Sequence, residues 1–329
     1  MATKRIDWID TAKGIGIFLV VWGHFYADDT LKIIIYGFHM PLFFFLSGYL
    51  YKIRDIRFLP FLKKKSKQLL LPFFIFQILT FAIVNGLSLV GSGQLYEPLM
   101  TQVSQFFFLQ GEVGFNSPLW FLVVLFSVEI VFYLCTRYVK KGQWLVIALL
   151  FILAFLLSKN EDVRVMFGLQ VLPVSLLFYY VGFKCKEWRV LERKAWSSWY
   201  MIVLGAVAYL CTVFYLNQGQ IVGFRSNNLG NFFLFAVGAL LGIITFCLIC
   251  KKIGKSALWE LFGRNSLIIM GTHYFFLILF ANAWKLFMHE TLAAVYPIWV
   301  TLLLTVFAFS VYYVFFELCR NQKNSESGT

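Results

Sequence analysis

The sequence predicts an all-α fold, a polytopic transmembrane helix bundle with about ten spans and both termini in the cytoplasm. Of the 329 residues, 60% are hydrophobic and only 14% are charged, far from the balance of soluble domains. Mean hydropathy is +0.76, and the apolar residues fall in repeated runs of about 20, the length that crosses a bilayer. These observations exclude a soluble enzyme, a disordered chain, a secreted disulfide scaffold and an outer-membrane barrel.

The hydropathy pattern gives ten candidate spans. They lie at roughly 14–28, 33–51, 69–90, 117–136, 143–158, 166–183, 199–217, 229–250, 266–287 and 293–316. We expect residues 1–320 to form a single transmembrane domain and residues 321–329 to form a short, polar and disordered cytoplasmic tail.

The net charge of +13, from 29 Lys and Arg against 16 Asp and Glu, is an orientation signal. With the N-terminus inside, all but five of the basic residues lie on the cytoplasmic side, as the positive-inside rule requires. Nucleic acid is therefore not an expected partner. The six cysteines fall within spans or at their cytoplasmic ends, which predicts no disulfide framework. No metal is expected, because Cys247 and Cys250 lie in an apolar helix without a second ligand pair.

The first span carries four ionisable residues on one predicted face: Asp10, Lys13, His24 and Asp28. Lys13 and His24 are separated by about 1100° of helix rotation and about 16 Å of axis. A lysine at the cytoplasmic edge therefore places the imidazole near mid-membrane on the same face. Ionisable groups at that depth indicate function, and imidazole suits general-base chemistry. The alternative is structural, with His24 bonded to a backbone carbonyl and Lys13 anchoring the topology.

A basic cytoplasmic loop is predicted between the second and third spans. Seven cations lie within residues 52–67: Lys52, Arg54, Arg57, Lys63, Lys64, Lys65 and Lys67. Such a cluster attracts anionic lipid headgroups or holds a phosphorylated cytosolic donor, besides anchoring the topology. Lys64 and Lys67 share one face at the predicted start of the third span, and we single them out as a pair.

Three polar residues in later spans have both a packing and a functional interpretation. His39 lies in the outer half of the second span, just before Pro41, which is expected to kink the helix. Glu129 lies deep in the fourth span, where its structural partner would be a Ser, Tyr or Lys of a neighbouring helix. His273 lies near the middle of the ninth span.

Together these motifs resemble the acyltransferase-3 superfamily of integral membrane O-acyltransferases. The resemblance rests on motifs spread along the chain: Asp10-x-x-Lys13-Gly14 with Trp22-Gly23-His24, His39-Met40-Pro41 with Ser47-Gly48, Lys64-x-x-Lys67, Leu119-Trp120, and Gly263-x-x-Ser266 with His273. The family commonly has Arg where this chain has Lys13, Lys64 and Lys67. The branch resembled most includes capsule and sugar O-acetyltransferases.

The resemblance implies a plasma (inner) membrane enzyme that transfers acetyl from acetyl-CoA, its co-substrate, to a hydroxyl of a cell-envelope or capsular glycan. It implies catalytic roles for His24, Asp10 and Lys13, with His24 as general base or as acyl carrier. Lys13, Lys64 and Lys67 would bind the CoA phosphates. The expected acceptor contacts are Asp28, His39, Trp120, Glu129 and His273.

The expected partners are acyl-CoA, the glycan acceptor, the lipid bilayer and glycan-assembly machinery. The alternative function is a transporter or flippase for a lipid-linked glycan or polysaccharide. The ionisable residues on one face of the first span, and the ten spans, suit that alternative as well, although the chain shows no internal repeat of the kind common in transporters. Dependence on CoA separates the two functions.

Overall fold

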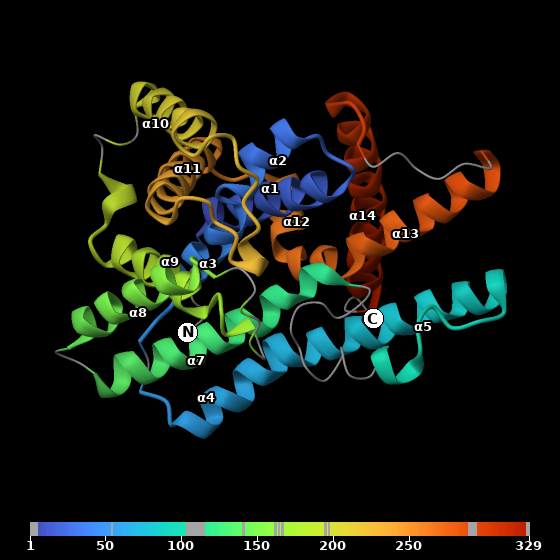
Figure 1. The fold of residues 1–329 in the computed structure, drawn as a ribbon, viewed down its shortest axis with the longest axis horizontal. Coiled ribbons are helices and arrows are strands. Elements are labelled where there is room, and N and C mark those ends of the chain that lie inside the picture. The colour runs from blue at the N-terminus through green and yellow to red at the C-terminus, as the bar shows by residue number, and fades with distance from the viewer. Residues whose placement is uncertain are drawn as a thin grey trace. The chain divides into compact units, whose positions relative to one another are not determined.

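The computed structural model describes residues 6–53, 55–102, 116–139, 142–160, 163, 165, 168–193, 196, 198–288 and 295–326. Within these ranges the chain forms helices and no β-strand, which confirms the predicted all-α class (Figure 1). The chain divides into two compact units. Unit 1 comprises Met1–His39, Leu191–Ile221 and Phe233–Thr329, and unit 2 comprises Met40–Val190 and Val222–Phe232.

Unit 1 is organised around its first helix. Its helices are α1 (Asp7–His24), α2 (Asp29–Tyr36), α10 (Trp199–Cys211), nearly all of α11 (Phe232–Ile253), α12 (Ala257–Arg264), α13 (Ser266–Met288) and α14 (Ile298–Glu326). Helices α2, α12, α13 and α14 all pack against α1. Two hydrogen bonds fasten it: Thr11 Oγ1 donates to the Gly254 carbonyl (2.8 Å), and Trp22 Nε1 donates to Thr301 Oγ1 (3.0 Å).

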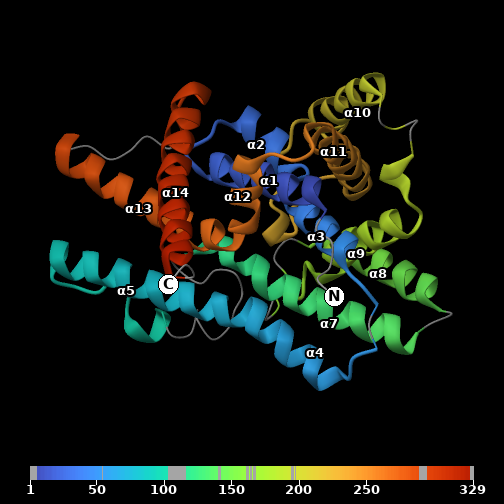
Figure 2. The same ribbon diagram turned by 180° about the vertical axis from the view of Figure 1, so that it is seen from behind.

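Unit 2 is organised around a long interrupted helix. Its helices are α3 (His39–Leu50) apart from its first residue, α4 (Phe58–Lys65), α5 (Leu71–Ser92), α7 (Trp120–Tyr138), α8 (Gln143–Leu157) and α9 (Leu172–Glu187). A π turn, Ser66–Leu70, joins α4 to α5 in one continuous helical run. This run lies beside α7 in both views (Figures 1 and 2).

A glycine pair brings two helices into backbone contact in each unit. In unit 1, Gly14 of α1 faces the Trp259 carbonyl of α12, and Gly263 of α12 faces the Asp10 carbonyl of α1. In unit 2, Gly48 of α3 and Gly182 of α9 meet in the same reciprocal way, against the carbonyls of Tyr179 and Phe45. Small residues permit such close crossings in membrane proteins, where van der Waals packing drives helix association.

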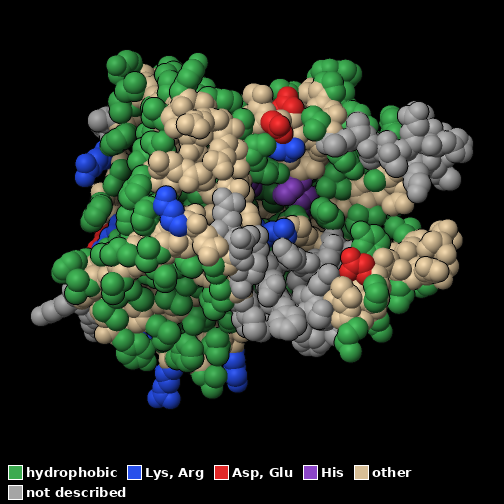
Figure 3. Space-filling model, viewed as in Figure 1, with side chains coloured by type: hydrophobic (Ala, Val, Ile, Leu, Met, Phe, Trp, Pro, Cys, Tyr) green, Lys and Arg blue, Asp and Glu red, His purple; other side chains and the backbone are tan. Residues whose placement is uncertain are grey.

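A helix lies at each of the ten predicted span positions. Seven helical segments of the described chain are long and apolar enough to cross a membrane: Asp29–Leu50, Phe58–Ser92, Ser117–Tyr138, Trp199–Leu216, Phe232–Ile253, Ser266–Trp284 and Ile298–Gln322. The other three positions are α1, with three charged residues, and the shorter helices α8 and α9. Hydrophobic side chains cover much of the surface seen in Figure 3. The count of ten and the cytoplasmic termini stay predictions.

Four expected boundaries differ from the structure. Helix α1 ends at His24 rather than at residue 28. Helix α4 begins at Phe58, so much of the predicted basic loop is helical. The second predicted span is interrupted at residues 37–38, and Pro41, where a kink was expected, lies in the first turn of the helix that follows this break. Helix α14 continues to Glu326, into the segment expected to be a disordered tail.

Candidate active site

Three histidines and a tyrosine gather in unit 1. The His24 and His273 rings have centroids 5.6 Å apart, and the Tyr36 ring lies 6.0 Å from His24 and 4.9 Å from His39. His24 is the last residue of α1, His273 belongs to α13, and Tyr36 and His39 flank the junction of α2 and α3. The sequence singled out all three histidines as site residues, and the structure brings them together.

The hydrogen bonds of the two buried histidines define their tautomers. His39 Nδ1 lies 2.9 Å from the Ile35 carbonyl, and His273 Nδ1 lies 3.1 Å from the Ile269 carbonyl. Because a carbonyl oxygen only accepts, Nδ1 carries the proton in both rings, and Nε2 is an acceptor in the neutral form. The His273 side chain is fully buried, and its Nε2 has no hydrogen-bond partner among the residues that the structure describes. It is therefore able to accept a proton or a hydrogen bond from a bound molecule.

Tyr36 connects His24 to His39. Its hydroxyl donates to the Gly23 carbonyl at 3.0 Å, which joins α2 to the end of α1. Gly23 is needed for this contact, because a Cβ there would lie 2.7 Å from the tyrosine ring. The residue that precedes His24 therefore allows Tyr36 to pack against it, and sequence reasoning did not single Tyr36 out.

The other end of α1 carries charge. Lys13 is half-buried there, in the same continuous helix as His24. Asp10 Oδ2 lies 3.7 Å from Arg264 Nε of α12, and Arg264 Nη2 pairs with Glu260 Oε2 at 2.8 Å. The resemblance implied a catalytic role for Asp10 together with Lys13 and His24. The structure shows that its carboxylate also faces Arg264, a residue that sequence reasoning missed although its i,i+4 spacing from Glu260 was a usable signal.

The expectation that Asp28 shares the α1 face is wrong. The helix ends at His24, and Tyr26 follows with a φ of 54°, a left-handed conformation that stops a helix. Asp28 is instead the N-cap of α2, where its Oδ1 accepts from the Leu31 N–H at 2.7 Å. An N-cap carboxylate satisfies an otherwise unpaired backbone donor, which gives Asp28 a structural explanation.

In unit 2, the predicted donor pair lies where α4 meets the π turn. Lys64 is in the last turn of α4 and Lys67 is in the π turn, and both are exposed. Lys65 between them is different, because its Nζ lies 2.6 Å from Glu129 Oε2 of α7. The contact is an ion pair rather than a well-directed hydrogen bond. A lysine of a neighbouring helix is thus the partner of Glu129, as its packing interpretation allowed. Arg54 lies outside the described residues.

Trp120 begins α7 and belongs to an aromatic stack in unit 2. Phe224 contacts both Phe44 and Trp120, with centroid distances of 5.9 and 6.1 Å and ring planes inclined by 28° and 27°. Arg225, next to Phe224, donates from Nη1 to Ser117 Oγ at 2.9 Å. Trp120 is half-buried in this stack.

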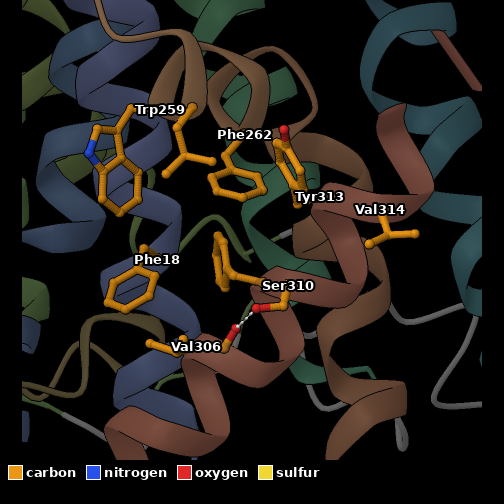
Figure 4. Close-up of a pocket in the computed structure, with 9 residues that line it drawn as sticks. Phe18, Trp259, Phe262, Val306, Ser310, Tyr313 and Val314 are labelled. Carbon is orange, nitrogen blue, oxygen red and sulfur yellow. Dashed lines mark hydrogen bonds between the residues drawn. The ribbon is translucent and has the colours of Figure 1, made fainter. Parts of the chain in front are cut away.

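An apolar pocket of about 390 Å³ lies among α1, α12 and α14 of unit 1 (Figure 4). It is lined by Phe18, Leu258, Trp259, Phe262, Val306, Phe309, Ser310, Tyr313 and Val314. The Ser310 hydroxyl donates to the Val306 carbonyl of its own helix at 2.9 Å. None of the three histidines is among the residues that line this pocket.

Comparison with known proteins identifies the family. A family model described as an acyltransferase domain, acyltransferase-3, matches residues 6–317, nearly the whole chain. No curated protein and no solved structure gave a significant match. The matched range includes every residue of the histidine cluster, Lys13 and the pair Lys64 and Lys67. The chain therefore belongs to the acyltransferase-3 family and is a multi-pass membrane acyltransferase.

Proposed function

We propose that this acyltransferase moves an acetyl group from acetyl-CoA to a hydroxyl of a cell-envelope or capsular glycan at the plasma membrane. The observation that carries the proposal is the histidine cluster of unit 1, in which His24 and His273 have ring centroids 5.6 Å apart. Lys13 lies eleven residues before His24 on the same helix, about 16 Å along its axis. A cation and an imidazole so spaced suit a donor with an anionic end and a reactive end.

In the proposed reaction His24 is the general base. It takes the proton of the acceptor hydroxyl as the oxygen attacks the thioester carbonyl carbon. The carbon–sulfur bond then breaks, and His24 returns the proton to the CoA thiolate, so that the products are an O-acetyl ester and CoA. His273, with its unpartnered Nε2, is proposed to accept a hydrogen bond from the acceptor.

The exposed pair Lys64 and Lys67 of unit 2 is proposed to interact with the donor phosphates, and Lys13 of unit 1 is a separate candidate for such a contact. Lysine keeps the charge that phosphate recognition needs, although it lacks the bidentate geometry of arginine. Contacts of this kind weaken as salt screens the charges. Donor affinity should therefore fall as the ionic strength rises.

The test measures CoA release by the purified protein in nanodiscs, with and without a glycan extract from the cell envelope. His24→Ala should lower glycan-stimulated release by about 100-fold or more, the range of general-base contributions. Lys64→Ala/Lys67→Ala should raise the KM for acetyl-CoA by about tenfold per lost charged contact. Lys63→Ala is the matched control, since it removes an exposed charge from the same helix.

Two results would overturn the proposal. His24→Ala protein that is folded and retains full acyl transfer removes His24 from the chemistry. Folded wild-type protein that neither binds nor turns over acetyl-CoA favours the transporter or flippase function instead. Radiolabelled acetyl-CoA supplied without acceptor distinguishes the two roles of His24, because only an acyl carrier accumulates label on the protein.

A further inference from the structure

We propose that Glu129 and Lys65 are a positioning pair, which sets the rotation of α4 about its axis so that Lys64 and Lys67 face outward together. The inference rests on the proposed function in one respect, the assignment of these two lysines to the donor phosphates. It gives Glu129 a role other than acceptor contact.

The first observation is that lysines close together in the sequence differ in burial. The Lys65 side chain is only 19% exposed and that of Glu129 only 9%, with 2.6 Å between Nζ and Oε2. Lys64 and Lys67 on either side are exposed. Successive residues of a helix point about 100° apart, so burying Lys65 against Glu129 directs Lys64 away from α7. The identity of the buried lysine therefore determines which of the other lysines are exposed on the surface of α4 and the π turn.

The face of α7 that contains Glu129 matches the face of α4 that contains Lys65. Glu129 and Tyr133 are four residues apart on α7, and Lys65 and Phe61 are four residues apart on α4, so each pair shares a helix face. The Tyr133 and Phe61 rings stack with centroids 4.4 Å apart. The Tyr133 hydroxyl also donates to the Ile56 carbonyl at 2.6 Å. Stacking brings the helices together, and the ion pair selects the lysine that points inward.

The π turn explains why the rotation of α4 must be set locally. In this turn the Leu71 N–H donates to the Ser66 carbonyl five residues earlier, in place of the usual four. Such turns are uncommon and occur frequently at functional sites. The turn follows Lys65 directly, so the phase of α4 differs from that of a regular helix continued from α5. The stack of Phe61 on Tyr133 and the contact of Lys65 with Glu129 together hold α4 in that phase.

The first test is kinetic and uses acetyl-CoA as the probe. Glu129→Gln and Lys65→Met should each raise the KM for acetyl-CoA about tenfold, the effect of misplacing one charged contact, with kcat within about twofold. The exchanged pair Glu129→Lys/Lys65→Glu should restore KM to within about threefold of the wild-type value. Arg137→Gln is the matched control. It breaks an exposed ion pair between α7 and Asp55, which should contribute little.

The second test does not require acyl transfer. Reductive methylation followed by mass spectrometry reports the accessibility of each lysine. In wild-type protein Lys64 and Lys67 should react faster than Lys65. In Glu129→Gln protein Lys65 should gain reactivity while Lys64 or Lys67 loses it. The inference is overturned if Lys65 reacts as fast as Lys64 in the wild type, or if Glu129→Gln changes neither this pattern nor KM.

The two tests also separate this inference from the proposed function. If methylation follows the expected pattern but the protein turns over no acetyl-CoA, the positioning pair stands and the assignment of the donor fails. If acetyl-CoA is turned over and Glu129→Gln lowers kcat with KM unchanged, the donor assignment stands and the positioning role fails.

Discussion

Replacing Gly14 by alanine should separate α1 from α12. A methyl group at Gly14 would lie 2.8 Å from the carbonyl carbon of Trp259 and closer still to its oxygen, whereas ordinary contacts begin at 3.4 Å. The two backbones must therefore part by at least 0.6 Å, the difference between 3.4 and 2.8 Å. Rotation of a side chain cannot relieve the clash, because the obstructing atoms belong to the backbone.

Overpacking of this kind costs about 1–3 kcal/mol. By the scaling for domains of 150–250 residues, we expect the melting temperature of Gly14→Ala to fall by roughly 2–12 °C. The measurement is thermal unfolding of the purified protein in detergent, followed by intrinsic fluorescence. The separation should also weaken the contact between Asp10 and Arg264, which is already 3.7 Å long.

Gly86→Ala is the control for this experiment. Gly86 lies within α5, and a Cβ there would meet nothing within 4 Å. Alanine is favoured over glycine inside a helix by about 0.5–1 kcal/mol, so this variant should melt at or above the wild-type temperature. If Gly14→Ala melts together with Gly86→Ala, then the close backbone crossing of α1 and α12 does not exist and the reasoning is refuted.

Three further predictions concern local contacts. Asp28→Ala should destabilise the protein by about 1 kcal/mol, whereas Asp28→Ser should retain the cap of α2 and most of the stability; equal melting of the two variants would contradict a capping role. Trp22→Phe should cost about 0.5–1.5 kcal/mol through the lost hydrogen bond to Thr301, and an unchanged unfolding curve would exclude that bond. Gly48→Ala should lower the melting temperature as Gly14→Ala does, because its Cβ would lie 2.7 Å from the Tyr179 carbonyl carbon; a neutral effect would contradict the α3–α9 crossing.

Helical periodicity predicted the relation between Lys13 and His24, but it did not predict where the helix stops. Their spacing of eleven residues is a property of any continuous helix, and α1 is continuous from Asp7 to His24. Asp28 was wrongly expected on this helix face because no glycine or proline marks the end of α1. The helix ends instead at the left-handed conformation of Tyr26. Asp28 itself was the available signal, as a residue type that caps helices.

The pairing of Lys65 with Glu129 was beyond sequence reasoning for a different reason. Lys63, Lys64 and Lys65 are identical in type, and only the rotation of α4 decides which of them is buried. That rotation depends on packing against α7, a helix distant in sequence. The early start of α4 could have been predicted from the sequence, because Pro60 falls in its first turn, where proline is tolerated. The basic character of the segment suggested a loop instead.

The π turn has a consequence for how the length of this chain can vary. Five residues close this turn where four close an α-helical turn, so removing one residue from Ser66–Leu70 would leave an ordinary α-helical turn and keep α4 near its present rotation relative to α5. Other changes of length inside the helical run rotate α4 by about 100° per residue, whereas the segment before Phe58 is not helical and can absorb a change of length. Natural and engineered variants of this chain should therefore tolerate indels on the N-terminal side of α4 and a one-residue deletion inside the π turn, and resist other indels within the run.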